Sequence, residues 1–305
     1  MDRRFKSQKY DGFTVVELLV SISILSLLTA MLLPAIQGSR EAARQTTCRN
    51  HLHQIGIASH TFEESHGRFP STYEAYDDLS RILADRSSDW RCPSDAMSQS
   101  GRGFGYLLND GTAFPSRRNG LMVWPVPRPD DNPKNTKSAE VLDGLSQTAA
   151  WSERLLIGSA FISTIPTRGT ESEMRADAIR YLWYLPQHYI TVEDAVEACE
   201  TVRVTPFPFY YNTGTGNGND SFFGYRHMLP PNRISCMNEV APSETDPAHY
   251  SQDGSHMSTA TSQHPGLVFV LFCDGSVHPI SDNIDLDAWR AMGTRNGQET
   301  VATGF

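Results

Sequence analysis

The chain has 305 residues, a formal charge of −9 and 39% hydrophobic residues. This length allows one large domain or two small ones with a hydrophobic core, and the acidic balance disfavours binding to nucleic acid through a basic patch. Its five cysteines, Cys48, Cys92, Cys199, Cys236 and Cys273, allow up to two disulfides with one thiol left over.

The N-terminal part of the chain predicts a membrane anchor. Residues 18–39 carry no formal charge, and a helix of this length is long enough to cross the roughly 30 Å hydrocarbon core of a bilayer. A short leader, residues 1–12, has four basic residues against two acidic ones, which favours an N-terminus in the cytoplasm. We therefore expect a single-pass protein of the cytoplasmic (inner) membrane with an extracytoplasmic C-terminal domain.

Glu17 lies one turn into the apolar N-terminal stretch, residues 10–34, and its carboxylate needs a partner because an isolated charge is unfavourable in hydrocarbon. Cleavage after Gly12 would give Phe13 a free amine, which could neutralise Glu17 on the same or a neighbouring copy. Gly12-Phe13-Thr14-x-x-Glu17 followed by an apolar helix resembles the processing site of type IV prepilins and type II secretion pseudopilins. The resemblance implies cleavage by a prepilin peptidase, N-methylation of Phe13 and a role for Glu17 in docking into a helical filament.

Two other interpretations of the N-terminus are weaker. An ordinary secretory signal peptide would have a shorter apolar region and a small-residue cleavage site behind it, and neither is obvious here. An uncleaved single-pass anchor remains the main alternative to prepilin-type processing. Removal of the leader, which has a net charge of +2, would leave a mature chain with a charge of −11.

Helical periodicity continues beyond the apolar run. Pro34 predicts a kink near the outer membrane face, and an apolar stripe then recurs at three- and four-residue spacing. This stripe consists of Leu52, Ile55, Ser59 and Phe62. We expect one long helix that crosses the membrane over residues 13–36, continues as an outer half over 37–66, and packs on a domain formed by residues 67–305.

The middle of the chain predicts short elements. Residues 73–84 have the pattern of a short amphipathic helix, and the following stretch to residue 133 reads as short strands with turns. An inserted helical and loop segment is expected at about 165–250. It would contain one helix over residues 174–185, stopped by a proline, and a second helix that begins at Thr191.

The C-terminal part predicts a hairpin and a final helix. Residues 267–273 are apolar on both faces, which is typical of a buried central strand, and Asp274-Gly275 is a two-residue hairpin signal. Residues 276–280 would return antiparallel. A last helix would have Asp285 as its N-cap and Gly293 as its stop.

These stretches together resemble a large uncharacterised bacterial family that combines a prepilin-type N-terminus with a C-terminal H-x9-D-G motif. His264, Asp274 and Gly275 match that motif. The other agreeing positions include Cys48-x-Asn50-x-Leu52, Cys92-Pro93-Ser94-Asp95 and Asp143-Gly144 with Glu153. The resemblance implies an α+β fold in which the long helix packs on an antiparallel sheet. Members have been described both as pseudopilins and as solute-binding or transport proteins.

A metal site at the family motif is the weaker of two interpretations. His264 and Asp274 could hold a divalent cation with Asp253, His256 or Glu153, and some pseudopilins use loop carboxylates and carbonyls to bind calcium. An imidazole is a poor calcium ligand, because this ion prefers oxygen donors. We therefore expect no cofactor, with His264 closing a turn and Asp274 forming the hairpin.

The cysteines suggest one pairing. Cys199 and Cys236 flank the glycine-rich stretch 212–220 and are the pair that we favour for a disulfide. Cys48 on the emerging helix and Cys273 in a buried strand are explained well enough as small apolar side chains.

The sequence predicts a structural subunit rather than an enzyme. It contains no G-x-S-x-G, H-E-x-x-H or C-x-x-C motif. We expect self-association through the N-terminal helix and, as partners, a prepilin peptidase and inner-membrane components of a type II secretion or pilus-like assembly. The alternative is an anchored binding protein that presents a solute or glycan to a transport system, with Tyr181, Trp183 and Tyr184 among the aromatic residues of its pocket.

Overall fold

The chain divides into two compact units, Met1–Ala43 and Arg44–Phe305. The structure is a computed structural model that describes residues 14–70, 79, 81, 91–96, 101–102, 105–112, 119–121, 136–158, 178–180, 182–201, 224–238 and 256–299. The longest element, α1 (Val15–His66), is a single α-helix that includes Pro34 and contributes residues to both units.

The first unit is an apolar helical segment without a core of its own. Every described side chain from Thr14 to Arg40 is exposed, and the mean hydropathy of an 18-residue window reaches 2.3. The hydroxyls of Ser21, Ser23 and Thr29 donate to carbonyls one turn back at 2.7–2.9 Å, so the helix satisfies these polar groups internally. By length and composition this is the one described helix that could cross a membrane.

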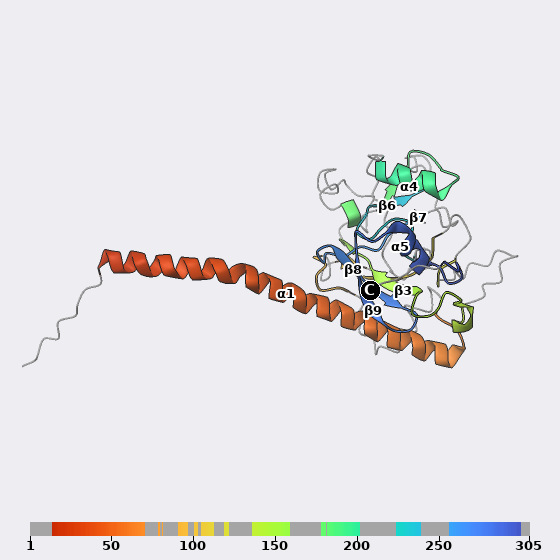
Figure 1. The fold of residues 1–305 in the computed structure, drawn as a ribbon, viewed down its shortest axis with the longest axis horizontal. Helices are drawn as coiled ribbons and strands as arrows, with labels where there is room; N and C mark the ends of the chain where they lie inside the picture. The colour runs from red at the N-terminus through yellow and green to blue at the C-terminus, as the bar shows by residue number, and fades with distance from the viewer. Residues whose placement is uncertain are drawn as a thin grey trace, which may run out of the picture. The chain divides into compact units, whose positions relative to one another are not determined.

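The second unit is built on a four-stranded antiparallel sheet with the order β2-β3-β8-β9. Its strands are β2 (Tyr106–Leu108), β3 (Ala149–Glu153), β8 (Leu267–Phe272) and β9 (Val277–Ser281). The part of α1 after residue 44 lies against this sheet (Figure 1), where Leu52, Ile55 and Phe62 join the same buried cluster as Val270. At Gly56 the helix comes so close that a Cβ would lie 3.0 Å from the Leu271 side chain.

A smaller sheet has its own apolar cluster in the same unit. Its order is β5 (Leu182–Tyr184), β6 (Ser235–Met237) and β7 (His256–Met257), with β5 parallel to β6. Helix α4 (Val192–Thr201) lies beside β6 in Figure 1 and buries Val196 and Cys199. Apart from a C-terminal helix, the remaining described elements are β1 (Gly101–Arg102), β4 (Ile157–Gly158), η2 (Ser138–Glu140) and η4 (Ala178–Arg180).

The predicted α+β class is confirmed, with the outer part of the long helix packed on an antiparallel sheet. The predicted helix beginning after Thr191 is α4, and the final helix is α5 (Leu286–Gly293). The Asp285 side chain accepts hydrogen bonds from the backbone of Asp287 and Ala288 at 3.1 and 3.0 Å, as an N-cap should.

The predicted helix over residues 174–185 is wrong in its described part. A short 3-10 turn at Ala178–Arg180 is followed by strand β5, in which Leu182 faces Ser235 and Trp183 faces Cys236. Pairing with a strand more than 50 positions away therefore overrides the local helical pattern. The helix expected at 73–84 lies largely outside the described residues.

The C-terminal hairpin forms as predicted, but its loop is one residue longer. The Gly275 amide donates to the Phe272 carbonyl at 3.0 Å, and the Phe272 amide donates to the Ser276 carbonyl at 2.8 Å. Cys273 therefore belongs to the turn rather than to the strand. Gly275 has a φ of 87°, the left-handed conformation that a three-residue hairpin loop places at its last position.

Candidate functional site

The start of α1 holds Glu17 in a capping box. The backbone amide and hydroxyl of Thr14 donate to Glu17 Oε2 at 2.9 and 2.8 Å, and the Glu17 amide donates back to Thr14 Oγ1 at 3.3 Å. The Thr14 carbonyl accepts from Leu18 at 3.2 Å, which makes Thr14 the N-cap. The two residues thus satisfy backbone amides that would otherwise lack partners at a helix end. Gly12 and Phe13 lie outside the described residues.

The capping box also fixes the direction of the Glu17 carboxylate. Both hydrogen bonds from Thr14 go to one oxygen, Oε2. The described contacts therefore leave Oε1 as the atom that an approaching cation could bind. The side chain lies one turn into a helix whose described neighbours are exposed and apolar, among them Val16, Leu18 and Val20. A carboxylate held in this way can accept a charge-assisted hydrogen bond from an ammonium group.

Two disulfides link distant segments of the second unit. Cys199 is joined to Cys236, the pair favoured from the sequence, with Cα atoms 6.0 Å apart. The sequence-based explanation of Cys48 is wrong, since it is joined to Cys92 across 44 positions. Spacing could not reveal this bond because it depends on how residues 91–96 pack back against the helix. Cys273 is the free cysteine, and burial together with the charge of Asp274 raises the pKa of its thiol well above the usual range.

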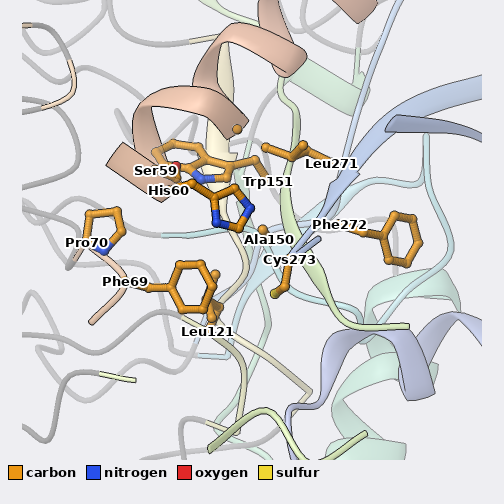
Figure 2. A pocket seen from close by; sticks show the side chains of 11 residues that line it. Ser59, His60, Phe69, Pro70, Leu121, Ala150, Trp151, Leu271, Phe272 and Cys273 are labelled. Carbon is orange, nitrogen blue, oxygen red and sulfur yellow. The ribbon is translucent and has the colours of Figure 1, made fainter. Parts of the chain in front are cut away.

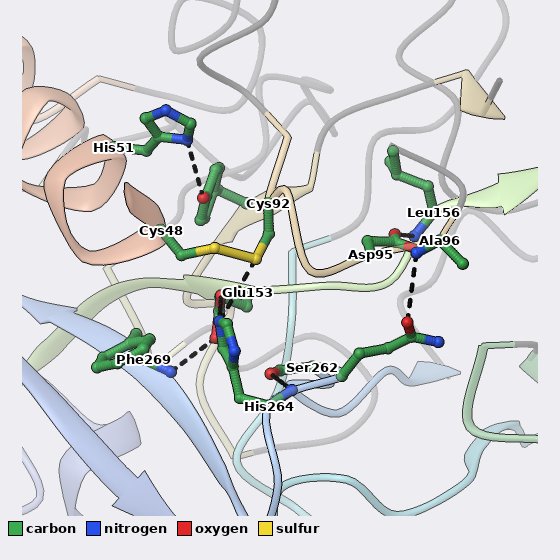
Figure 3. Close-up of a disulfide and its surroundings, with 12 residues drawn as sticks. Cys48, His51, Cys92, Asp95, Ala96, Glu153, Leu156, Ser262, His264 and Phe269 are labelled. Atoms are coloured by element: carbon green, nitrogen blue, oxygen red, sulfur yellow. Dashed lines mark hydrogen bonds and ion pairs between the residues drawn. A yellow bond between two sulfur atoms is a disulfide. The ribbon is translucent and has the colours of Figure 1, made fainter. Parts of the chain in front are cut away.

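A buried polar cluster surrounds the disulfide between Cys48 and Cys92 (Figure 3). His264 Nε2 lies 3.4 Å from Cys92 Sγ and 3.2 Å from Glu153 Oε1. The other carboxylate oxygen of Glu153 accepts from the Phe269 amide at 2.8 Å. All of these side chains are less than 10% exposed and come from α1, the 91–96 segment, β3 and the approach to β8.

The structure does not bring His264 and Asp274 together. They flank opposite ends of β8, whose six residues span roughly 20 Å at the usual rise per residue, so they cannot ligate the same ion. Asp274 Oδ1 instead accepts from the amide and hydroxyl of Ser276 at 2.9 and 2.6 Å and stabilises the hairpin turn. His256 lies 4.0 Å from Asp110, and Asp253 lies outside the described residues.

A small apolar pocket opens between the outer part of α1 and the main sheet (Figure 2). Its lining includes Ser59, His60, Phe69, Trp151 and Leu271. The space inside it that a water-sized sphere can occupy is about 10 Å³, which is about the least that one water molecule needs. Trp183, an aromatic residue predicted for a binding pocket, is buried in the cluster under the smaller sheet instead.

Comparison with known proteins identifies the family. The model of a family described as a protein of unknown function (DUF1559) matches residues 37–92 and 85–287. The chain belongs to this family. A second model, the prokaryotic N-terminal methylation motif, matches residues 7–33 and so contains Gly12, Phe13 and Glu17. This DUF1559 chain therefore has a pilin-like, prepilin-type N-terminus. No curated protein and no solved structure matches it in a search of either.

Buried ion pairs are the polar contacts that sequence reasoning missed in this DUF1559 protein. Arg180 donates to Asp95 Oδ1 at 2.7 Å, and the Leu156 amide donates to Asp95 Oδ2 at 2.7 Å. Arg226 Nε donates to Asp110 at 2.8 Å. The Cys92-Pro93-Ser94-Asp95 stretch was the sequence signal that could have indicated one of these pairs. Its first residue forms a disulfide and its last residue forms an ion pair.

A third buried arginine links the two sheets. Arg154, just after β3, donates to Ser235 Oγ in β6 at 2.8 Å and to the Thr259 carbonyl at 3.0 Å. Burial and the neighbouring charge of Arg180 lower the pKa of Arg154 to about 10, so it stays charged at neutral pH. The smaller sheet is thus fixed to the larger one through fully buried polar contacts.

Proposed function

We propose that this protein is a pilin- or pseudopilin-like structural subunit, processed after Gly12, of a type II secretion or type IV pilus-like assembly. The observation that carries the proposal is the match to the N-terminal methylation motif over residues 7–33, together with the capping box that orients Glu17. A prepilin-type N-terminus is typical of a structural subunit and gives no reason to expect an enzyme.

Cleavage after Gly12 would produce the amine that assembly then requires. A prepilin peptidase cuts between Gly12 and Phe13, and the new amine of Phe13 is then methylated. That amine, on a neighbouring copy, binds the Glu17 carboxylate, whose Oε1 is not engaged by Thr14. Two opposite charges that meet in hydrocarbon are far more favourable than either alone, so the pair sets the register between neighbouring helices.

The exposed part of α1 supplies the remaining contact surface. Leu18, Leu25 and Leu32 are 56–60% exposed, and they represent a segment whose described side chains make no core of their own. In a bilayer this segment spans the hydrocarbon, and in an assembly it packs against other copies. The excess of basic residues in the leader favours a cytoplasmic N-terminus and, with it, a second unit outside the cytoplasm.

In-cell crosslinking in the native host tests this proposal. A Leu25→Cys substitution puts a thiol in the exposed helix, while the native cysteines are in disulfides or, for Cys273, buried. We expect ladders in the membrane fraction that disappear with Glu17→Ala and with a block of cleavage after Gly12. The matched control Glu64→Gln, at an exposed glutamate near the other end of α1, should leave the ladders unchanged.

A processed protein that remains monomeric in this experiment would contradict the assembly role. It would support the alternative of an anchored solute- or glycan-binding protein. The described part of the second unit offers no observation that favours this alternative, because its pocket is small and apolar.

A further inference from the structure

The two cysteines of the first disulfide and two side chains beside it have the composition and placement of a metal site. The ligand atoms of Cys48, Cys92, Glu153 and His264 all lie within 4.8 Å of one another, and all four residues are buried. In Figure 3 the His264 ring points toward the disulfide and toward Glu153. None of the four residues belongs to the N-terminal unit, Met1–Ala43, which contains the processing motif on which the proposed function depends.

The contacts of His264 distinguish a ligand set from a catalytic triad. In a nucleophile–base–carboxylate triad the histidine uses one ring nitrogen for the nucleophile and the other for the carboxylate. Here a single atom, Nε2, lies 3.4 Å from Cys92 Sγ and 3.2 Å from Glu153 Oε1. One nitrogen that faces both sulfur and carboxylate oxygen is the arrangement expected around a shared cation.

The distances suit tetrahedral zinc. With Zn–S of about 2.3 Å, Zn–N of about 2.0–2.1 Å and Zn–O of about 2.0–2.2 Å, the edges of the tetrahedron are roughly 3.6 Å for S···N and 3.4 Å for N···O. The observed values of 3.4 and 3.2 Å are shorter by only about 0.2 Å. Thiolate and imidazole donors select zinc over calcium, which takes oxygen ligands.

A backbone hydrogen bond already orients the Glu153 carboxylate. The Phe269 amide donates to Glu153 Oε2 at 2.8 Å, which leaves Oε1 directed at His264. Backbone hydrogen bonds of this kind orient metal-ligating carboxylates. The remaining obstacle is the S–S bond, since two sulfurs bonded to each other cannot take separate corners of a tetrahedron whose S···S edge is roughly 3.8 Å.

We propose that reduction of the Cys48–Cys92 disulfide converts this cluster into a zinc site with Cys48, Cys92, His264 and Glu153 as ligands. A dithiol reductant supplies two electrons and two protons and is itself oxidised to a disulfide, while the S–S bond breaks and two thiols form. Zinc then displaces both thiol protons to solvent and binds the two thiolates. The helix, the 91–96 segment and β3 are held together in either state, by a covalent bond or by the metal.

The test uses the full chain in detergent micelles, reduced with a water-soluble phosphine, which supplies the same two electrons and is oxidised to its phosphine oxide. Zinc per chain is measured by mass spectrometry after gel filtration, with and without reduction. We expect about one tightly bound zinc in the reduced protein and none in the oxidised protein. Cobalt in place of zinc should give the visible bands of tetrahedral thiolate coordination.

Variants separate this site from other thiols. The double variant Cys48→Ser/Cys92→Ser and the variant His264→Gln should lose the zinc, and Glu153→Gln should bind it at least tenfold more weakly, in line with the usual effect of disturbing a metal site. The matched control, Cys199→Ser/Cys236→Ser, should retain one zinc because this second disulfide lies outside the cluster.

Alkylation of the unsubstituted protein provides a readout that does not depend on any variant folding. Zinc should slow the reaction of Cys48 and Cys92 with iodoacetamide by at least tenfold while leaving the rates at the buried Cys199 and Cys236 unchanged. Equal protection of both pairs would overturn the proposal, as would reduced protein that binds no more zinc than Cys48→Ser/Cys92→Ser. Cys273 is buried in the folded unit, so its rapid labelling in the presence of zinc would show that the unit had opened. The metal would then have failed to replace the disulfide, which would also overturn the proposal.

Discussion

Between Thr14 and Arg40 every described side chain is exposed, whereas in the second unit Leu52, Trp151 and Trp289 are completely buried. In the described part of the first segment, no residue of the apolar window is buried. The second unit buries both apolar side chains and charged ones. The contrast fits a membrane-anchored protein, in which a bilayer covers the apolar N-terminal helix while the C-terminal unit is stabilised by its own contacts.

The buried charges of the second unit provide the strongest test of this contrast. Asp110→Asn should leave the Arg226 guanidinium charged in a site that is 2% exposed, and removing one partner of a buried pair destabilises by about 3–5 kcal/mol. Denaturant unfolding of the full chain in detergent would measure the loss. The control Glu64→Gln, an exposed residue of α1, should change the stability by no more than about 0.5 kcal/mol.

Acid should destabilise the second unit through His227. Burial lowers the pKa of His227 from 6.5 to about 3, although its Nδ1 lies 2.7 Å from the Trp289 carbonyl oxygen. The unfolded chain therefore takes up a proton below pH 6.5 that the folded chain does not. The histidine's contribution should be complete above pH 6.5 and should fall by roughly 1.4 kcal/mol per pH unit between 6.5 and about 3.

Unfolding free energies measured from pH 7 to pH 4 would show this slope. The His227→Gln variant has no titrating group at this position. It should be less stable at pH 7, and its unfolding free energy should depend less on pH. An unchanged slope in that variant would assign the acid sensitivity to other groups.

Two glycines allow a direct comparison of packing in the two units. A Cβ at Gly293 would lie 2.6 Å from His227 Cβ, whereas a Cβ at Gly38 meets nothing within 4 Å. Gly293→Ala should therefore destabilise by about 1–3 kcal/mol through overpacking. Gly38→Ala should leave the thermal midpoint of the second unit unchanged and favour the helix. Equal effects would mean that the first segment is packed against something within the chain.

The smallest expected effect is at the helix start. Thr14→Ala removes the hydroxyl that donates to Glu17 and caps its amide, and the lost cap should reduce crosslinked ladders from the Leu25→Cys protein by roughly fivefold. Thr14→Ser keeps the hydroxyl and should behave like the original protein. A loss with serine as large as that with alanine would show that the capping box does not position Glu17.

Local patterns were enough to predict several elements. The apolar run, the stripe through Leu52 and Ile55, the hairpin at Asp274-Gly275 and the N-cap at Asp285 depend on residues close in sequence, whose periodicity and turn chemistry favour one backbone conformation. For the same reason the resemblance of the N-terminus to prepilins could be read directly from Gly12 to Glu17.

Only the tertiary structure decided the rest, because these contacts join residues far apart in sequence. Cys48 meets Cys92 across 44 positions, and Glu153 reaches His264 from a different strand. Residues 182–184 form a strand because β6 lies beside them, although their local pattern favours a helix. The sequence by itself therefore determined the anchor and its processing motif. The position of each buried cysteine, carboxylate and arginine was decided by which distant segments packed together.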